Sequence, residues 1–217
     1  MKGRKHLTED ERDERKLLIM NTLERMFIDV RIEDFDLTVE NIAKKAGLAK
    51  GTIYLYYRSK DEMVFDSYIR SLKLKEKMLV NTLAPIQDPL ERFKAFLDFY
   101  YRFFKEYPQY LKLQIYCEGA NIYRQNVKRD QTQEYLKIAR STRAIIRQII
   151  QECVDEGYFR KELNVILTLH NIPHSLRGII HVCLFTFNDH YMHTDYNESA
   201  DNFYNNFVEI LLKGVMA

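Results

Sequence analysis

Residues that break helices are scarce in this sequence. Seven glycines and four prolines make up about 5% of the 217 residues, against an average share of about 12%. An all-β protein needs many tight turns, and glycine and proline are the residues that turns use most. Their scarcity therefore argues against a β-rich fold and favours long helices.

Further absences exclude several classes of protein. The three cysteines, Cys117, Cys153 and Cys183, are far apart and form no Cys-x-x-Cys pair, so neither a zinc cluster nor a disulfide framework is predicted. No uncharged apolar stretch approaches 18 residues, and residues 1–6 contain no apolar signal core. We therefore expect buried thiols, no metal, no cofactor, and a cytoplasmic protein that does not bind membranes.

Enzyme signatures are missing as well. The sequence contains no glycine-rich phosphate-binding loop, no nucleophile elbow and no His-Glu-x-x-His motif. We therefore expect that the protein is not an enzyme. A helical enzyme that uses the side chains of His170, His174 and Arg177 is an alternative, because this is the one candidate for chemistry in the sequence.

What is present indicates a folded helical protein. Apolar residues make up 46% of the chain, and 15 tyrosines and 13 phenylalanines provide a large area to bury. Capping residues and periodic apolar positions predict helices along nearly the whole chain. We expect them at about residues 9–30, 39–46, 49–56, 60–83, 89–107, 108–118, 131–156, 164–187 and 196–215.

Residues 38–60 carry the most informative pattern. Two short predicted helices are separated by a turn at Gly47, with Ala43 four residues before the glycine and Ile53 six residues after it. A helix-turn-helix needs a small residue where its helices cross, a glycine in the turn and an apolar anchor on the second helix. The segment therefore predicts a helix-turn-helix.

Positive charge is concentrated on the same segment, although the whole chain has a net charge of only +2. Between residues 38 and 60, five basic residues oppose a single acidic one, Glu40, which gives this segment a net charge of +4. The basic residues are Lys44, Lys45, Lys50, Arg58 and Lys60. Basic side chains interleaved with tyrosine hydroxyls suit contact with DNA phosphates.

Residues 37–60, LTVENIAKKAGLAKGTIYLYYRSK, resemble the DNA-binding signature of the TetR family of bacterial transcriptional regulators. The resemblance implies an all-α homodimer with an N-terminal helix-turn-helix domain over 1–60. A C-terminal helical domain over 61–217 would bind an effector and form the dimer. We expect a repressor that binds a palindromic double-stranded DNA operator and is released by a small molecule. A helical DNA-binding or interaction protein without a ligand is the alternative.

The resemblance also implies roles for particular residues. Lys50 and Thr52 would enter the major groove, beside Gly51, which lets the backbone approach DNA closely. The implied phosphate contacts are Thr38, Tyr54, Tyr56 and Lys60. The sequence departs from the family pattern at Ala49, where a polar residue is common, and at residues 32–35, which lack the usual loop glycine.

Two features of the second half suggest a ligand site. Aromatic residues between 96 and 123 either line a cavity or fill a helical core, and Phe104, Tyr107 and Tyr116 are our candidates for a cavity. A stripe on the helix 164–187 either lines that cavity, faces a partner or solvent, or binds a metal. The stripe consists of His170, His174, Arg177 and His181. We assign its first three members to the ligand site, because Pro173 is expected to kink their helix.

Overall fold

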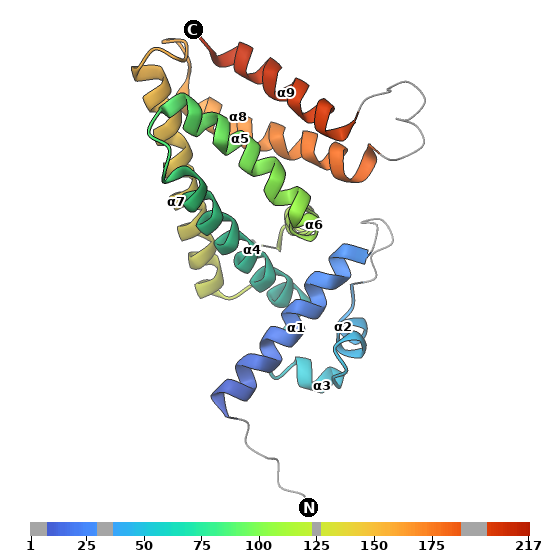
Figure 1. Ribbon diagram of the computed structural model, residues 1–217. Helices are drawn as coiled ribbons and strands as arrows, with labels where there is room; N and C mark the ends of the chain where they lie inside the picture. Colours follow the sequence, from blue (N-terminus) through green and yellow to red (C-terminus); the bar gives the residue numbers. More distant parts are fainter. Residues whose placement is uncertain (1–7, 30–36, 123–126, 188–198) are drawn as a thin grey trace, which may run out of the picture. The chain divides into compact units, whose positions relative to one another are not determined.

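The computed structural model describes residues 8–29, 37–122, 127–187 and 199–217, and within these ranges the chain is helical without any strand (Figure 1). The all-α prediction is confirmed. The helices are α1 (Glu9–Asp29), α2 (Val39–Lys45), α3 (Lys50–Ile53), α4 (Lys60–Leu83), α5 (Pro89–Glu106), α6 (Pro108–Gly119), α7 (Arg129–Asp155), α8 (Val165–His181), the π-helical turn η3 (Val182–Thr186) and α9 (Ala200–Val215).

The chain forms two compact units. The first contains residues 1–71 and 112–134, and the second contains residues 72–111 and 135–217. The first turns of α4 therefore belong to the first unit, where Met63, Val64 and Phe65 are fully buried. This structural division lies within α4, whereas the helix-turn-helix pattern in the sequence ends at residue 60.

Several helices begin where the capping pattern predicts. Glu11 donates its backbone N–H to the Thr8 hydroxyl, and the Glu11 carboxylate accepts the N–H of Thr8, which completes a capping box at the start of α1. At α5, Asp88 accepts the N–H of Glu91 at 2.8 Å, and Pro89 occupies the first helical position. These caps satisfy backbone donors that would otherwise lack partners.

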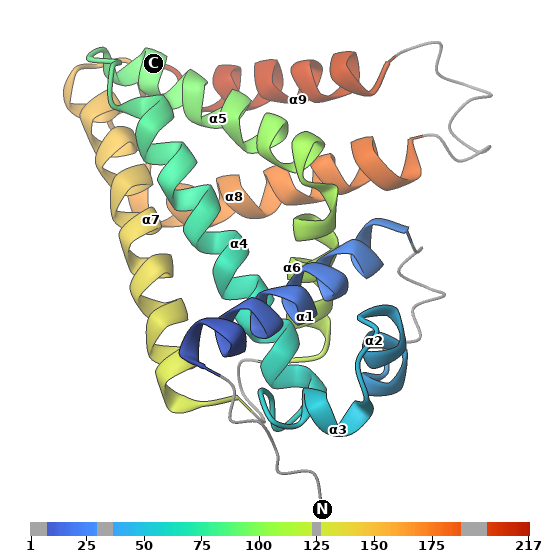
Figure 2. The same ribbon diagram turned by 60° about the horizontal axis from the view of Figure 1, so that its bottom comes forward.

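The core of the first unit joins α1 to the short helices that follow. The periodic apolar residues Ile19 and Leu23 of α1 are fully buried, and α1 contacts α2, which in turn contacts α3 (Figure 2). Tyr116, on the part of α6 that belongs to this unit, packs edge-to-face on Phe27 of α1, with ring centroids 5.8 Å apart. Residues from the middle of the chain thus complete the N-terminal core.

The core of the second unit is built largely from the aromatic side of α5. Phe93 packs edge-to-face on Phe159 at 4.9 Å, and Tyr101 stacks on Tyr204 of α9 at 4.2 Å. The Tyr204 hydroxyl donates to the carbonyl of Leu97, and Asp201 accepts the hydroxyl of Tyr101. These contacts fix α9 on α5, and α8 contacts both helices.

Some boundaries differ from the prediction. Helix α3 ends at Ile53 instead of Tyr56, because Leu55 and Tyr56 donate to carbonyls three residues earlier, in a tighter turn. Helix α8 passes through Pro173 and then widens into η3. Residues 1–7, with the basic Lys2, Arg4 and Lys5, and the loop at 32–35 lie outside the described residues.

The three cysteines are free and buried, which confirms the predicted buried thiols. Among the described residues, none of the helices is both long and apolar enough to span a membrane.

Candidate nucleic-acid interface

The turn between α2 and α3 has the geometry that a helix-turn-helix requires. Gly47 has a φ of +66°, a left-handed conformation that glycine adopts at little cost. The N–H of Leu48 donates to the carbonyl of Ala43, and the N–H of Gly47 donates to that of Lys44. This is a Schellman motif, which ends α2 and directs the chain into α3. The glycine in the sequence was therefore read correctly.

Five apolar residues are expected on the inner face of the two helices, and three of them are buried, whereas Ala46 and Leu48 are half-buried. Ile42 and Ala43 of α2 and Ile53 of α3 are at most 2% exposed, and Tyr57 beyond α3 is equally buried. Ala43 offers only a methyl group, so α3 can approach α2 closely. Packing on this face leaves the opposite face of α3 in contact with solvent.

The outer face carries the predicted DNA contacts. Lys50, Gly51 and Tyr54 are exposed and Thr52 is half-buried. A Cβ built on Gly51 would meet no atom within 4 Å, so its surface is open. The Lys50 ammonium pairs with the carboxylate of Glu40 on α2. An exposed pair of this kind contributes only about 0–1 kcal/mol, so DNA phosphates can displace the carboxylate at little cost.

The other residues that are implied to bind phosphates differ in exposure and in their hydrogen-bond partners. Thr38 accepts the N–H of Asn41 and caps α2, as predicted. The Lys60 ammonium lies 5.7 Å from the centroid of the Tyr116 ring, within range of a cation–π interaction. The Tyr56 hydroxyl oxygen is buried and forms no hydrogen bond within the described part of the chain. In this conformation, Tyr54 presents its ring to solvent and Tyr56 turns its hydroxyl inward.

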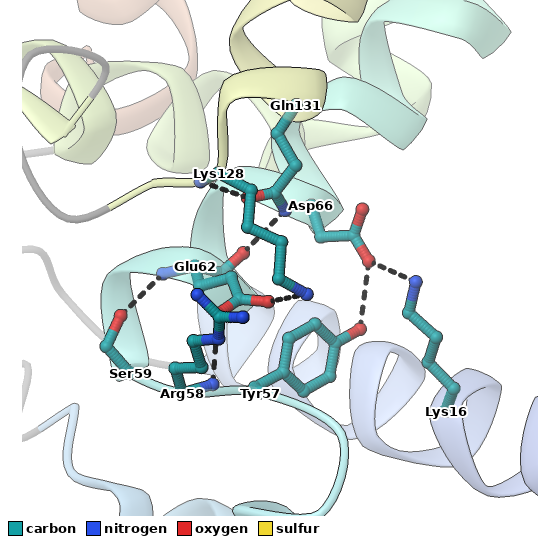
Figure 3. Close-up of polar contacts among 8 residues, drawn as sticks. All are labelled: Lys16, Tyr57, Arg58, Ser59, Glu62, Asp66, Lys128 and Gln131. Carbon is teal, nitrogen blue, oxygen red and sulfur yellow. Dashed lines mark hydrogen bonds and ion pairs between the residues drawn. The ribbon is translucent and has the colours of Figure 1, made fainter.

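A polar cluster beside the helix-turn-helix was not anticipated from the sequence (Figure 3). The cluster consists of Lys16, Tyr57, Glu62, Asp66, Lys128 and Gln131. These residues line a cavity of about 200 Å³ together with Tyr56, Asp130 and Glu134. Asp66 of α4 accepts the Tyr57 hydroxyl at 3.0 Å and pairs with Lys16 of α1 at 2.8 Å. Burial, followed by the charge of Asp66, raises the pKa of Tyr57, so the hydroxyl remains a donor. Only folding brings Lys16 to Asp66, since 50 positions separate them in sequence.

The residues predicted to bind a ligand lie in several places. Phe104 is 1% exposed and packs on Tyr100, with ring centroids 5.4 Å apart, so it is part of the aromatic core. Tyr107 is half-buried beside Phe103 in the same unit, whereas Tyr116 belongs to the first unit. The ligand-site assignment of these three residues stays a prediction.

The histidine stripe of α8 has mixed exposure. His170 and His174 are exposed, and Arg177 and His181 are half-buried. Burial lowers the pKa of His181. His170 lines a groove of about 550 Å³ between α7 and α8, opposite a row of arginines on α7. The arginines are Arg140, Arg143 and Arg147. Within the described ranges, no three His, Cys, Asp or Glu side chains are grouped to hold a metal.

A basic, exposed second helix on a buried anchor is the arrangement of helix-turn-helix DNA-binding proteins. Comparison with known families agrees, because residues 33–66 match the sequence model of the bacterial regulatory proteins of the tetR family. A search of curated protein sequences found no matching relative.

Solved structures extend the likeness from this segment to the whole fold. A transcriptional regulator from Saccharomonospora viridis in complex with choline has a TM-score of 0.72 at 15% identity, over 94% of this chain and 99% of that one. The ketosteroid regulator KstR2 of Mycobacterium tuberculosis has a TM-score of 0.64 at 18% identity, over 94% and 95%. FadR of Bacillus subtilis in complex with stearoyl-CoA has a TM-score of 0.64 at 17% identity, over 91% and 98%.

The fold and the site thus define an all-helical chain with a helix-turn-helix of the DNA-binding type near its N-terminus. Residues 33–66 are similar to the bacterial regulatory proteins of the tetR family, and the chain shares its fold with the solved regulators along its length.

Proposed function

We propose that the protein is a cytoplasmic repressor that binds a palindromic operator as a homodimer and is released by a small-molecule effector. In this proposal residues 1–60 bind DNA, and residues 61–217 bind the effector and form the dimer. The observation that carries the proposal is the exposed face of α3, where Lys50, Gly51 and Tyr54 are accessible above a buried Ile53.

The proposed contacts with the DNA major groove and the proposed contacts with phosphates come from different parts of this face. Lys50 and Thr52 are on α3 itself and are proposed to read base edges in the major groove. Thr38, Tyr54 and Lys60 flank α3 and are proposed to bind phosphates, which sets the register of the protein on the duplex. Tyr56 can join them only if its ring turns outward, because its hydroxyl is buried in this structure.

The homodimer is supported by apolar surface on the last two helices. An open groove of about 630 Å³ between α8 and α9 is lined by Ile179, Phe203, Phe207 and Ile210, and the side chain of Ile210 is 63% exposed. Asn202, Asn205, Asn206 and Glu209 also line the groove, and exposed apolar side chains within a polar rim favour association. A closed two-fold pair would cover the groove on both copies and would double the number of DNA contacts.

A groove in the second unit supports the proposal of an effector site there. The groove between α7 and α8 combines Arg140, Arg143 and Arg147 with the apolar Leu169, a lining that suits a ligand with an anionic head and an apolar body. The choline and stearoyl-CoA complexes of two structural neighbours support the proposal that this chain also binds a small molecule.

The dimeric, palindromic mode of binding is tested by two measurements on the full chain. Light scattering at micromolar concentration should give the mass of a dimer, and a footprint on DNA upstream of its own gene should show two half-sites related by a dyad. One copy of α3, the proposed recognition helix, makes too few base contacts for tight specific binding, so pairing is expected. A monomer in solution, or a footprint without a dyad, would contradict the proposal.

The two tyrosines provide a matched pair of variants for the phosphate contacts. Tyr54→Phe removes an exposed hydroxyl and is expected to weaken binding to specific and nonspecific duplexes alike, by about tenfold for a dimer that loses two hydrogen bonds. Tyr56→Phe removes a buried hydroxyl and should leave both affinities nearly unchanged. Fluorescence anisotropy with the two duplexes measures both variants. Equal losses in the two variants would show that Tyr56 turns outward on DNA.

A further inference from the structure

A basic side chain far along the sequence is in contact with the start of α4. Lys128, one residue before α7, places its ammonium 2.5 Å from a carboxylate oxygen of Glu62 (Figure 3). The side chain of Glu62 is only 3% exposed. Gln131 adds a second link, because its amide donates to the backbone carbonyl of Glu62 and its oxygen accepts the N–H of Lys128.

Glu62 in turn holds the chain that leads out of the recognition helix. Its second carboxylate oxygen accepts the backbone N–H of Arg58 at 3.0 Å, and its own N–H donates to the Ser59 hydroxyl at 3.1 Å. The preceding residue, Tyr57, is tied to Asp66 by its hydroxyl. Three consecutive residues, 57–59, are thereby fixed on α4, directly after the turn that ends α3.

The ion pair between Lys128 and Glu62 helps to hold residues 57–59 on α4. A buried carboxylate is tolerated when it is paired and hydrogen-bonded, and removing one partner leaves an uncompensated charge in a poorly solvated place. Without Lys128, the Glu62 carboxylate would lose its charged partner in a poorly solvated place and would have to move towards water. That movement would disturb the oxygen that accepts the N–H of Arg58.

We propose that Lys128 is a positioning residue for DNA binding. Through its pair with Glu62 it fixes the orientation of α3 relative to the start of α4. Lys128 does not touch DNA itself. The inference rests on the proposed DNA-binding function. It assigns a role in DNA binding to a residue 62 positions beyond the end of the segment 33–66 that matches the family.

The two roles open to a lysine here have different signatures in a salt titration. A phosphate contact releases counterions, so its loss reduces the slope of log affinity against log salt by about one for each contact. A positioning residue changes the affinity and leaves the slope as it was. A control for the loss of one positive charge is Lys137→Met, because Lys137 is an exposed lysine on α7.

The experiment uses the full chain and a duplex enriched from a random library by the wild-type protein. Failure to enrich any duplex would contradict the proposed function itself and not this inference alone. Lys128→Met is expected to lower the affinity for the enriched duplex by about tenfold with an unchanged slope, whereas Lys128→Arg retains the affinity and Lys137→Met has little effect. A slope reduced by about two for the dimer would make Lys128 a phosphate contact and overturn the proposal.

A double-mutant cycle tests whether the effect passes through Glu62. In a Glu62→Gln background, Lys128→Met should cause no further loss of affinity, because the pair is already broken. A further tenfold loss in that background would overturn the proposal. The double variant also guards against misfolding, since it leaves no uncompensated buried charge. If it folds, by circular dichroism, and binds as tightly as wild type, the pair does not position the recognition helix.

Discussion

Raising the salt concentration from 50 to 200 mM is expected to weaken operator binding by about 10³- to 10⁵-fold, the range for 6–10 neutralised phosphates in a dimer. The helix-turn-helix segment has a net charge of +4, and several of its lysines are exposed around α3. Each phosphate that a lysine neutralises releases condensed counterions, and salt opposes that release. Affinity measured by fluorescence anisotropy at five or more salt concentrations gives the slope.

A variant assigns part of that slope to one residue. Lys60→Ala should reduce it by about one for each half-site, because it removes one proposed phosphate contact per protomer. Lys137→Ala, on α7, is the matched control, because it removes one exposed positive charge by the same substitution. An affinity that hardly depends on salt would contradict phosphate contacts by this face, and an unchanged slope in Lys60→Ala would show that the lysine keeps its place over Tyr116 when DNA is bound.

Replacing Phe104 with alanine is expected to destabilise the protein by about 3–5 kcal/mol, the usual cost of emptying a buried phenylalanine site. The Phe104 ring is 1% exposed, and it packs on Phe103 and Tyr100. The Lys75 ammonium, 5.2 Å from its centroid, would lose a cation–π partner as well. Urea denaturation followed by circular dichroism measures the loss.

The same variant distinguishes a core residue from the wall of a ligand cavity. Tyr107→Ala is the comparison, because Tyr107 is half-buried and its truncation should cost much less. If Phe104→Ala changes the free energy of unfolding by less than about 1 kcal/mol, the ring faces space that the protein does not fill, as a cavity residue would. That outcome would favour the ligand role that the sequence suggested for Phe104.

Local patterns in the sequence determined the helices and the DNA-binding element. Capping boxes, few chain breakers and 3.6-residue periodicity act over one or two turns, so they can be read without the fold. The turn at Gly47 is of this kind, because its left-handed conformation and its two hydrogen bonds involve only neighbouring residues. The buried Ile53 and the exposed Lys50 follow from the same periodicity.

Side-chain direction was harder to predict where several roles suited one residue. Tyr54 and Tyr56 are equivalent in the sequence pattern, yet one is exposed and the other buries its hydroxyl. The aromatic residues of α5 fitted both a cavity and a core, and the structure packs Phe93, Phe96 and Phe103 tightly. Burial depends on which helices cover a face, and periodicity reports only that a face is apolar.

The sequence by itself determined the all-helical class, the position of the helix-turn-helix and the excess of positive charge on it. Only the tertiary structure decided which distant residues complete the first unit. Tyr116 packs on Phe27, and Lys128 pairs with Glu62, although 89 and 66 residues separate the partners in the chain. Such pairs cannot be recognised from the local sequence. The residues around a lysine that neutralises a buried carboxylate do not differ in kind from those around a lysine on a helical surface. Folding distinguishes them, since it removes water from one carboxylate and leaves it around another.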